Sequence, residues 1–586
     1  YANTGGTYGA GSHNNFFGQC AGYYNTTGAY NTFIGRYAGR SNNGSFNNFI
    51  GLSAGRNNTG GYLNNFIGSY AGHCNSGGSN NNFFGNQAGY SNDSGSGNNF
   101  FGHQAGRNNT TGSFNNFIGR YAGYFNTTGS ENNFIGRYGG YYNTTGSHNN
   151  FFGFEAGCNN TTGCYNNFFG QKAGYCNTEG AYGEVPNHNN FFGQCAGYYN
   201  TGGSYNNFFG QKAGYCNTTG GDNNFIGSYA GYCNTEGRSN NFLGVSAGRY
   251  NTTGIYNNFF GRQAGYVNDS GRDNNFFGNF AGRNNTTGCN NNFIGYYAGA
   301  YNTTGSNNNF LGSLGGYCNT TGTDNNFFGL DAGRNNITGT DNNFFGRNAG
   351  YNNTIGACDI YFAGSNNNFF GRDAGYCNTG GFNNNFFGNQ AGYSNEAGFY
   401  NNFIGLCAGY SNTGGNYNTF VGANAGRNNT TASNNIAIGV NAGTLALSPS
   451  GLDNFTTTGN LIVMGNANHT NACIQIAWSV ASDIRYKCVW GNVSHGRDFL
   501  KGVNPIEYSF KNKETDEVTD NYKRYGFSAQ EILALEGDNP VITKTDNPDR
   551  LGLTYEYFIP ILVNAIKELD AENKEILARL EALENR

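Results

Sequence analysis

Ser482 and Lys487 lie five residues apart near the C-terminal end of this chain, and residues of these two types could support covalent chemistry. A serine hydroxyl can attack a neighbouring carbonyl when a base takes its proton. An unprotonated lysine amine can be that base if burial lowers the lysine pKa. Water then opens the resulting ester, so the net reaction would be cleavage of a peptide bond. Serine and lysine are common on protein surfaces, and the pair therefore needs support from the residues around it.

Four short blocks around this pair, in this order, resemble a known family. They are SDIRYK at 482–487, NPIEY at 504–508, GFSAQE at 526–531 and LGLTY at 551–555. This order resembles the intramolecular chaperone domain of phage tailspikes and tail fibres, the S74 peptidase family. The apolar stretch 488–490 departs from the family, in which a polar stretch is common there, but it leaves the serine and the lysine in place.

The resemblance implies a domain that trimerises a fibre, assists its folding and then cuts itself off. It implies that Ser482 is the nucleophile and Lys487 its base, with the cut between Ala481 and Ser482. Asp483 and Arg485 are expected to be an orienting or interface pair. The chain runs unbroken through the predicted cut, so it is either a precursor or a copy that cleaves slowly.

The rest of the chain repeats one unit of 17 residues, NNF(F/I)GxxAGxxNTTG, about 25 times from before Phe16 to about Gly443. A strict period this short predicts a stack of near-identical rungs. We therefore expect a mainly β protein, with a β-solenoid or β-roll rod at 1–445, a β transition region at 446–481 and a small α+β domain at 482–586. The repeat resembles the heads of trimeric autotransporter adhesins, whose period is shorter, and repeats found beside phage-type chaperone domains.

The unit itself suggests how a rung is built, if its first Phe is position 1, as in Phe100, and the Asn before the next unit is position 17. Positions 1 and 2 are both apolar, and neighbours on a strand point to opposite faces. Both faces then need cover, which favours a second layer or a multimer, most simply a trimer.

Glycines at positions 3, 7 and 13 permit turns or close approach, and the Asn pair at positions 16 and 17 is expected to form ladders. Stacking at about 4.8 Å would make such a rod roughly 120 Å long. Two longer units, near 181–188 and 357–365, are read as loops that are either neutral or a local binding bump.

The last residues predict a long helix at 556–586. Apolar residues and one Asn recur at alternating spacings of four and three, which is a heptad seam: Leu562, Ile566, Leu569, Asn573, Ile576, Leu580 and Leu583. A parallel trimeric coiled coil is the favoured interpretation. The alternative is an amphipathic helix that packs only on its own domain.

Position 10 opens an Asn-x-Ser/Thr sequon in about 14 units. The candidate N-glycosylation sites are Asn25, Asn109, Asn126, Asn143, Asn160, Asn217, Asn251, Asn285, Asn302, Asn319 and Asn429. Glycans at these sites would sheathe the rod. The other interpretation is that Asn-Thr-Thr-Gly is simply a favourable turn. Both interpretations place this Asn at an exposed corner.

Composition excludes several classes of function. Charged residues are 11% of the chain and the net charge is −4, which gives no electrostatic case for nucleic acid. No apolar run has the length of a membrane span. Without a Cys-x-x-Cys pair or regularly spaced Asp, we expect neither a metal nor another cofactor. Cysteines that recur at position 9, such as Cys216 and Cys233, could form disulfides between rungs or stay thiols. Tyrosine rows suit sugar adhesion or packing between chains equally.

These patterns favour a structural homotrimeric fibre, extracellular or on a virion, that serves attachment or surface display. A cell-surface glycan or another receptor is the expected partner. One alternative is a polysaccharide-degrading tailspike, but acidic residues in the rod are scattered singles and not the paired carboxylates of a glycosidase. Another is a glycosylated cellular adhesin or fibril, and an ice-binding Thr face is a remote third. The chain begins inside a repeat, so we expect an attachment segment before Tyr1.

Overall fold

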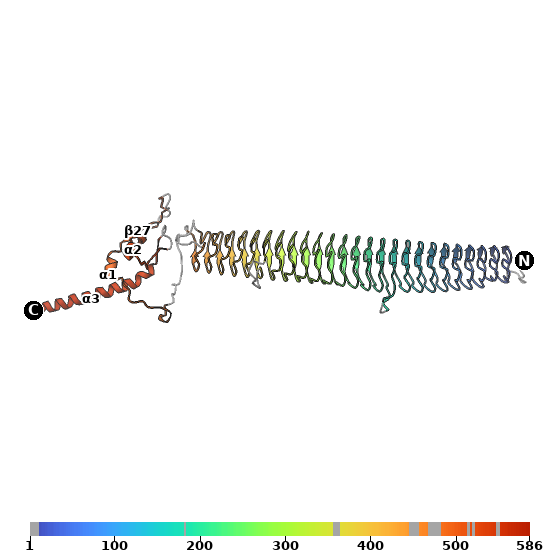
Figure 1. The fold of residues 1–586 in the computed structure, drawn as a ribbon, viewed down its shortest axis with the longest axis horizontal. Coiled ribbons are helices and arrows are strands. Elements are labelled where there is room, and N and C mark those ends of the chain that lie inside the picture. Colours follow the sequence, from blue (N-terminus) through green and yellow to red (C-terminus); the bar gives the residue numbers. More distant parts are fainter. Residues whose placement is uncertain are drawn as a thin grey trace. The chain divides into compact units, whose positions relative to one another are not determined.

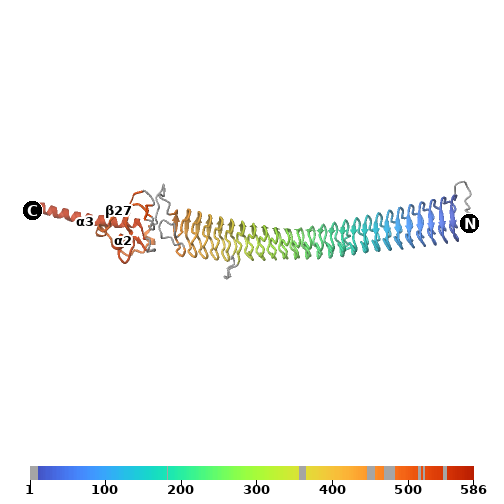
Figure 2. The ribbon, with the colours of Figure 1, turned by 90° about the horizontal axis from the view of Figure 1, so that it is seen from above.

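A computed structural model describes residues 11–180, 183–354, 364–444, 456–466, 482–511, 516–518, 522–545 and 551–585. Contacts between residues divide the chain into two units. One contains residues 1–390 with 394–397, and the other contains 391–393 with 398–586. The first unit consists of solenoid rungs stacked in a row, and the second holds the last rungs together with the C-terminal region (Figures 1 and 2).

Each rung contributes one strand of three residues, at positions 17, 1 and 2 of the repeat. The strands of the first unit are β1 (Asn15–Phe17), β2 (Thr32–Ile34), β3 (Asn48–Ile50), β4 (Asn65–Ile67), β5 (Asn82–Phe84), β6 (Asn99–Phe101), β7 (Asn116–Ile118), β8 (Asn133–Ile135), β9 (Asn150–Phe152), β10 (Asn167–Phe169), β11 (Asn190–Phe192), β12 (Asn207–Phe209), β13 (Asn224–Ile226), β14 (Asn241–Leu243), β15 (Asn258–Phe260), β16 (Asn275–Phe277), β17 (Asn292–Ile294), β18 (Asn309–Leu311), β19 (Asn326–Phe328), β20 (Asn343–Phe345), β21 (Asn368–Phe370) and β22 (Asn385–Phe387). Those of the second unit are β23 (Asn402–Ile404), β24 (Thr419–Val421), β25 (Ile436–Ile438) and β26 (Ile462–Met464). Neighbouring strands pair in parallel and in register, as where Phe100 lies opposite Phe117. The expected mainly β solenoid is confirmed, and the structure adds that each repeat unit makes one rung.

A column of phenylalanine rings forms the core of the rungs. Position 1 is fully buried from Phe33 onward, and the rings of consecutive rungs stack with centroids 4.8 Å apart, as between Phe100 and Phe117. Position 2 lies on the outer surface instead, with Phe101 38% and Ile118 43% exposed. A single chain therefore buries the position-1 face of its strands in its own core and leaves the position-2 face partly exposed. The cover expected for this second face is not supplied within one chain.

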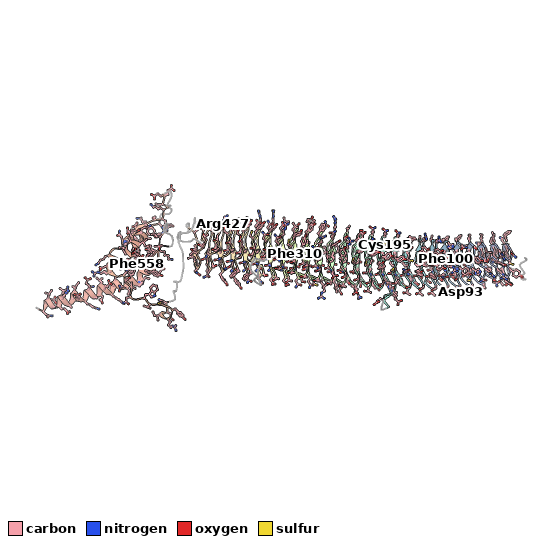
Figure 3. The ribbon with its side chains drawn as sticks, viewed as in Figure 1. Asp93, Phe100, Cys195, Phe310, Arg427 and Phe558 are labelled. Carbon is pink, nitrogen blue, oxygen red and sulfur yellow. The ribbon has the colours of Figure 1, made fainter. Side chains whose placement is uncertain are left out.

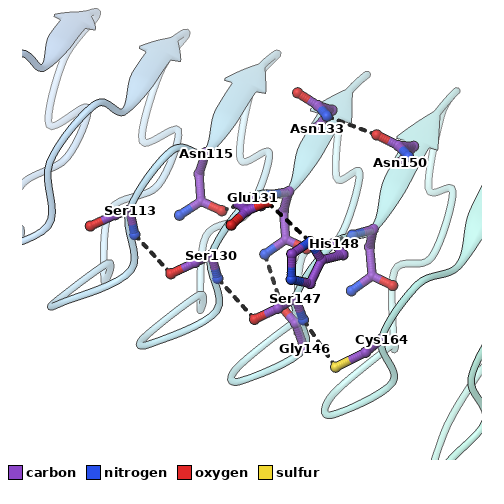
Figure 4. A network of polar contacts seen from close by, with 12 residues as sticks. Ser113, Asn115, Ser130, Glu131, Asn133, Gly146, Ser147, His148, Asn150 and Cys164 are labelled. Carbon is purple, nitrogen blue, oxygen red and sulfur yellow. Dashed lines mark hydrogen bonds and ion pairs between the residues drawn. The ribbon is translucent and has the colours of Figure 1, made fainter.

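Asparagine ladders tie successive rungs together. At position 17 the amide of Asn133 donates to the Oδ1 atom of Asn150 at 2.7 Å, as Figure 4 shows. At position 16 the Oδ1 atom of Asn98 accepts the backbone N–H of Asn115 at 2.9 Å, and the Asn98 amide donates to the carbonyl of Gly112 at 2.9 Å. The predicted ladders are confirmed, with the difference that position 16 mainly bonds to backbone. Each ladder satisfies polar groups that would be costly to bury unpaired.

The residues after the rungs form the small α+β region expected at 482–586. Its elements are η1 (Ile484–Tyr486), α1 (Arg497–Lys501), β27 (Pro505–Tyr508), β28 (Arg524–Phe527), α2 (Ala529–Glu536), β29 (Thr543–Lys544), β30 (Gly552–Leu553), η2 (Tyr555–Tyr557) and α3 (Phe558–Glu584). β27 pairs antiparallel with β28, and β29 antiparallel with β30. Ile532, Ile542, Phe558 and Ile561 make its buried core.

Some expectations concern residues outside the described part of the chain. These include Ala481, most of the β transition region expected at 446–481 and most of the longer unit at 357–365. The described part of that transition region contains the strand β26. None of the helices in the described part of the chain has the length and apolar character that a membrane crossing needs.

Candidate functional site

The site expected from the sequence is assembled within six consecutive residues. The short helical turn η1 brings Lys487 back toward the start of the segment. The backbone N–H of Lys487 donates to the carbonyl of Ile484 at 3.1 Å. The Nζ atom of Lys487 donates to the Oγ atom of Ser482 at 2.6 Å. The predicted nucleophile and base are thus within hydrogen-bond reach, which is the first geometric requirement for proton transfer.

Asp483 and Arg485 hold this turn in place. The Asp483 carboxylate accepts the backbone N–H of Arg485 at 2.9 Å and caps the turn, while the Arg485 guanidinium donates to the same carboxylate. The hydrogen bond from the Arg485 side chain, helped by the one from its backbone, lowers the pKa of Asp483. The two side chains bond to each other and not to Ser482 or Lys487, which fits the orienting pair expected from the sequence.

The surroundings of the pair are open and apolar. Ser482 and Lys487 are exposed, and so are their neighbours Ile484, Tyr486 (88%) and Trp490 (96%). A single chain therefore does not bury the amine, although it supplies the contact between the two reacting groups. Exposed apolar side chains on this scale are typical of a surface that contacts another protein.

One family model matches this segment. Residues 482–539 match the family model Peptidase_S74, described as Chaperone of endosialidase. The C-terminal region is thus similar to the chaperone-of-endosialidase family over residues 482–539. The match begins at Ser482, which is the residue expected to follow the cut, and it includes three of the four sequence blocks; the fourth, 551–555, lies beyond it. No curated protein and no solved structure matches the chain.

The position-10 asparagines of the rod, which are the candidate glycosylation sites, are not exposed as the sequence analysis expected. Asn25 is 5% exposed and the other ten candidates are fully buried. The amide of Asn126 donates to the Oδ1 atom of Asn109 at 2.6 Å and to the carbonyl of Gly129 at 2.9 Å. The expectation of an exposed corner is wrong, because these side chains turn inward and form a third ladder.

This ladder uses the atom that a glycan would need. N-glycosylation attaches sugar to the Asn Nδ2 atom, and in Asn126 that atom donates one hydrogen bond to the preceding rung and one within its own rung. The structure therefore favours the turn interpretation over the glycan interpretation at position 10. A neighbouring site was missed: Asn108, at position 9, opens its own Asn-Asn-Thr sequon and is only half-buried.

Secretion of the chain from a glycosylating host should give different glycan occupancy at Asn108 and Asn109. We expect the folded rod to carry no glycan at the buried Asn109, because modification would cost two hydrogen bonds and the space inside the rung. Asn108 on the same peptide is the internal comparison, since its side chain reaches the surface. Peptide mass spectrometry of protease-resistant rods makes the measurement, and glycan on Asn109 in such rods would contradict the buried ladder.

The cysteines that recur at position 9 are half-buried. Cys216 and Cys233, on consecutive rungs, are both free thiols. Burial raises the pKa of each, which keeps the thiol protonated and slows oxidation. Within the described residues there is no group of three His, Cys, Asp or Glu side chains that could hold a metal ion.

Proposed function

We propose that the chain is a homotrimeric fibre, extracellular or on a virion surface, which serves attachment or display. In this proposal the C-terminal chaperone segment trimerises the chains, guides rod folding and releases itself by cleavage between Ala481 and Ser482. The observation that carries the proposal is the division of α3 into two apolar faces. The chaperone-of-endosialidase match supports the same conclusion.

One face of α3 packs on its own domain. Phe558, Ile561 and Ala565 are buried there, and the helix is held further by a hydrogen bond from the Arg497 backbone to Glu568 at 2.7 Å. The alternative of an amphipathic helix docked on its own domain therefore describes the start of α3, from Phe558 to Glu568.

The predicted heptad seam forms a different face of α3. Its apolar members are about half exposed in the single chain, at 47% for Leu562, 64% for Ile566, 50% for Leu580 and 65% for Leu583. No other part of the described chain covers them, and an exposed apolar stripe of this length is the pattern of a coiled-coil partner surface. A parallel trimer of α3 would bury it.

The rod gives a physical reason for such a chaperone. Neighbouring rungs are nearly identical, so a shift by one rung preserves most contacts and costs little locally. A trimeric C-terminal region that forms first would fix the register for every rung that follows. Cleavage would then leave the mature rod without the helper, as the contact between Ser482 and Lys487 allows. The glycosylated-adhesin alternative loses its main support because the position-10 amides are buried.

Two charges in the seam should prevent assembly. Replacing Ile566 and Leu569 by Asp places carboxylates in the centre of the predicted trimer, where each would be desolvated without a partner. We expect the wild-type chain to sediment as a trimer and the variant as a monomer, with the α3 docking face intact. Lys567→Ala, between the two positions, is the control and should stay trimeric. A monomeric wild type, or a trimeric double variant, would contradict the proposal.

A further inference from the structure

Charges along the rod are separated onto different sides of the rungs. Residues 1–397 contain 16 Lys and Arg, and 14 of them fall at positions 4, 5 and 8 of the repeat. Of the 15 Asp and Glu in the same range, only three fall at these positions, and most of the others fall at positions 11, 12 and 15. We call the side chains at positions 4, 5 and 8 the basic face. In Figure 3, Cys195 at position 5 lies toward one long edge of the rod and Asp93 at position 11 toward the other.

Most cations on the basic face have no carboxylate beside them. The three carboxylates present are each paired with a cation of the same face: Glu155 with Lys172, Asp331 with Arg334 and Asp373 with Arg372. Subtracting these three from 14 leaves 11 cations on this face without an ion pair in the described rungs. Such a line of uncompensated charge attracts anions.

Tyrosine rings hold these guanidinium groups in a fixed column. From Tyr23 to Tyr376, position 8 is Tyr in 12 of 21 rungs and Arg in six. Arg107 lies over the rings of Tyr90 and Tyr124, in the rungs before and after it, at 5.2 and 5.7 Å from their centroids. The Arg107 side chain is fixed further because its Nε donates to Gln87 at 3.2 Å and its Nη1 to Asn108 at 3.1 Å. Stacking and these hydrogen bonds fix the guanidinium plane, and the Nη2 group is left to donate to an acid group.

Further along the column the same arrangement recurs with an unpaired donor. Arg249 lies 4.9 Å from the ring centroid of Tyr229 and 5.5 Å from that of Tyr232. Its Nε atom is buried and has no hydrogen-bond partner within the described chain. Between such cations the tyrosine rings stack on one another, as Tyr198 does on Tyr215 at 5.1 Å. The basic face thus alternates cations with aromatic surfaces that suit sugar rings.

We propose that this face binds an extended acidic polysaccharide, which deepens the attachment role proposed above and rests on it. The polymer would lie along the rod, with acid groups on the guanidinium edges and sugar rings against the tyrosines. Rungs β1 to β22 span roughly 100 Å at about 4.8 Å each, so 11 uncompensated cations give about one charge per 9 Å. This spacing fits a polymer in which only some of the sugars carry an acid group.

The spacing argues against nucleic acid. A single strand presents one phosphate per 3.4 Å and a duplex one per 1.7 Å, a much denser row of charge than the basic face can match. A second copy of the chain is also disfavoured. In a parallel, in-register assembly each rung would meet the same rung of the other copy, so a carboxylate at position 11, 12 or 15 would need a cation on the basic face of that same rung. Nine rungs carry such a carboxylate, and only five of them carry such a cation.

Two matched double variants test this proposal in the full-length chain. Arg249→Gln with Arg283→Gln removes two charges from the basic face, and Arg238→Gln with Arg272→Gln removes two at position 14, in nearby rungs but on another side. The probes are hyaluronan, which has an acid group on every second sugar, neutral dextran and oligothymidylate. Binding is measured at low and high salt, and sedimentation and intact mass are recorded on the same samples.

We expect the wild type to bind hyaluronan in a salt-sensitive manner and not to bind dextran. The basic-face variant should bind hyaluronan about five- to tenfold more weakly, the effect of two exposed ion pairs, and the position-14 variant should bind as the wild type does. Equal binding of dextran, tighter binding of oligothymidylate, equal effects of the two variants, or no binding of hyaluronan by intact rods would each overturn the proposal. Loss of the trimer or of cleavage would instead count against the proposed fibre function, because binding by the folded rod does not depend on either.

Discussion

Replacement of Ser482 by Ala is expected to abolish cleavage of this chain, whereas the wild type should separate into pieces of 481 and 105 residues. The reason is that the Ser482 hydroxyl lies 2.6 Å from the Lys487 amine, within reach of proton transfer. Without the oxygen no ester can form, and losses of roughly 10³-fold or more follow the removal of a catalytic nucleophile. Intact mass spectrometry of freshly expressed chains, followed over time, measures the fraction cut.

Lys487→Arg refines this test. Arginine retains the positive charge and can still donate to Ser482, but it stays protonated in proteins and cannot accept the serine proton. We expect this variant to be uncut and still trimeric. Ser494→Ala, an exposed serine in the same segment, is the control and should cleave normally. If wild type and Ser482→Ala stay equally intact as trimers, the chaperone segment is a permanent clamp and not a peptidase.

Gly78→Ala is expected to open the rod locally. A Cβ atom at Gly78 would lie 2.3 Å from the carbonyl oxygen of Gly95 and 2.5 Å from the Oδ1 atom of Asn75. Both are fixed, one by the backbone of the next rung and the other by the position-10 ladder, so the added methyl can be accommodated only by separating rungs. Overpacking of this kind costs about 1–3 kcal/mol, and loss of the hydrogen bond from Asn75 to the Gly78 carbonyl adds about 1 kcal/mol.

The adjacent glycine provides the matched control. A Cβ atom at Gly77 would meet nothing within 4 Å, so Gly77→Ala should be neutral or slightly stabilising, by about 0.4–1 kcal/mol. A stack of rungs does not unfold as one unit, and hydrogen exchange of residues 75–95 is therefore the suitable measurement. Faster exchange is expected for Gly78→Ala alone. Equal exchange in both variants would mean that the rungs are less tightly stacked at this corner than described.

The sequence by itself determined the rung and the identity of the C-terminal segment. A period of 17 with an apolar pair after two asparagines predicted a stack of near-identical β rungs, and the structure then showed that Phe100 and its equivalents at position 1 lie inside. The ordered blocks identified the chaperone segment because they lie close together in the chain. The pair Ser482 and Lys487 could be found for the same reason: a local turn joins them, and no distant element is needed.

The tertiary structure alone decided which way the remaining side chains face. Asn-Thr-Thr-Gly is compatible with an outward or an inward Asn, and Asn126 turns inward because its amide donates to the Oδ1 atom of Asn109 in the preceding rung as well as to the Gly129 carbonyl of its own rung. Positions 5 and 15 adopt left-handed backbone even with ordinary residues, such as Tyr121 (φ 63°) and Glu131 (φ 57°), because hydrogen bonds to the preceding rung hold them there. In the same way, α3 divides into a docking face and a seam only once α1 and α2 supply a surface for Phe558 and Ile561. In each case the deciding contact comes from a neighbouring rung or a distant segment, whose position a local pattern does not contain.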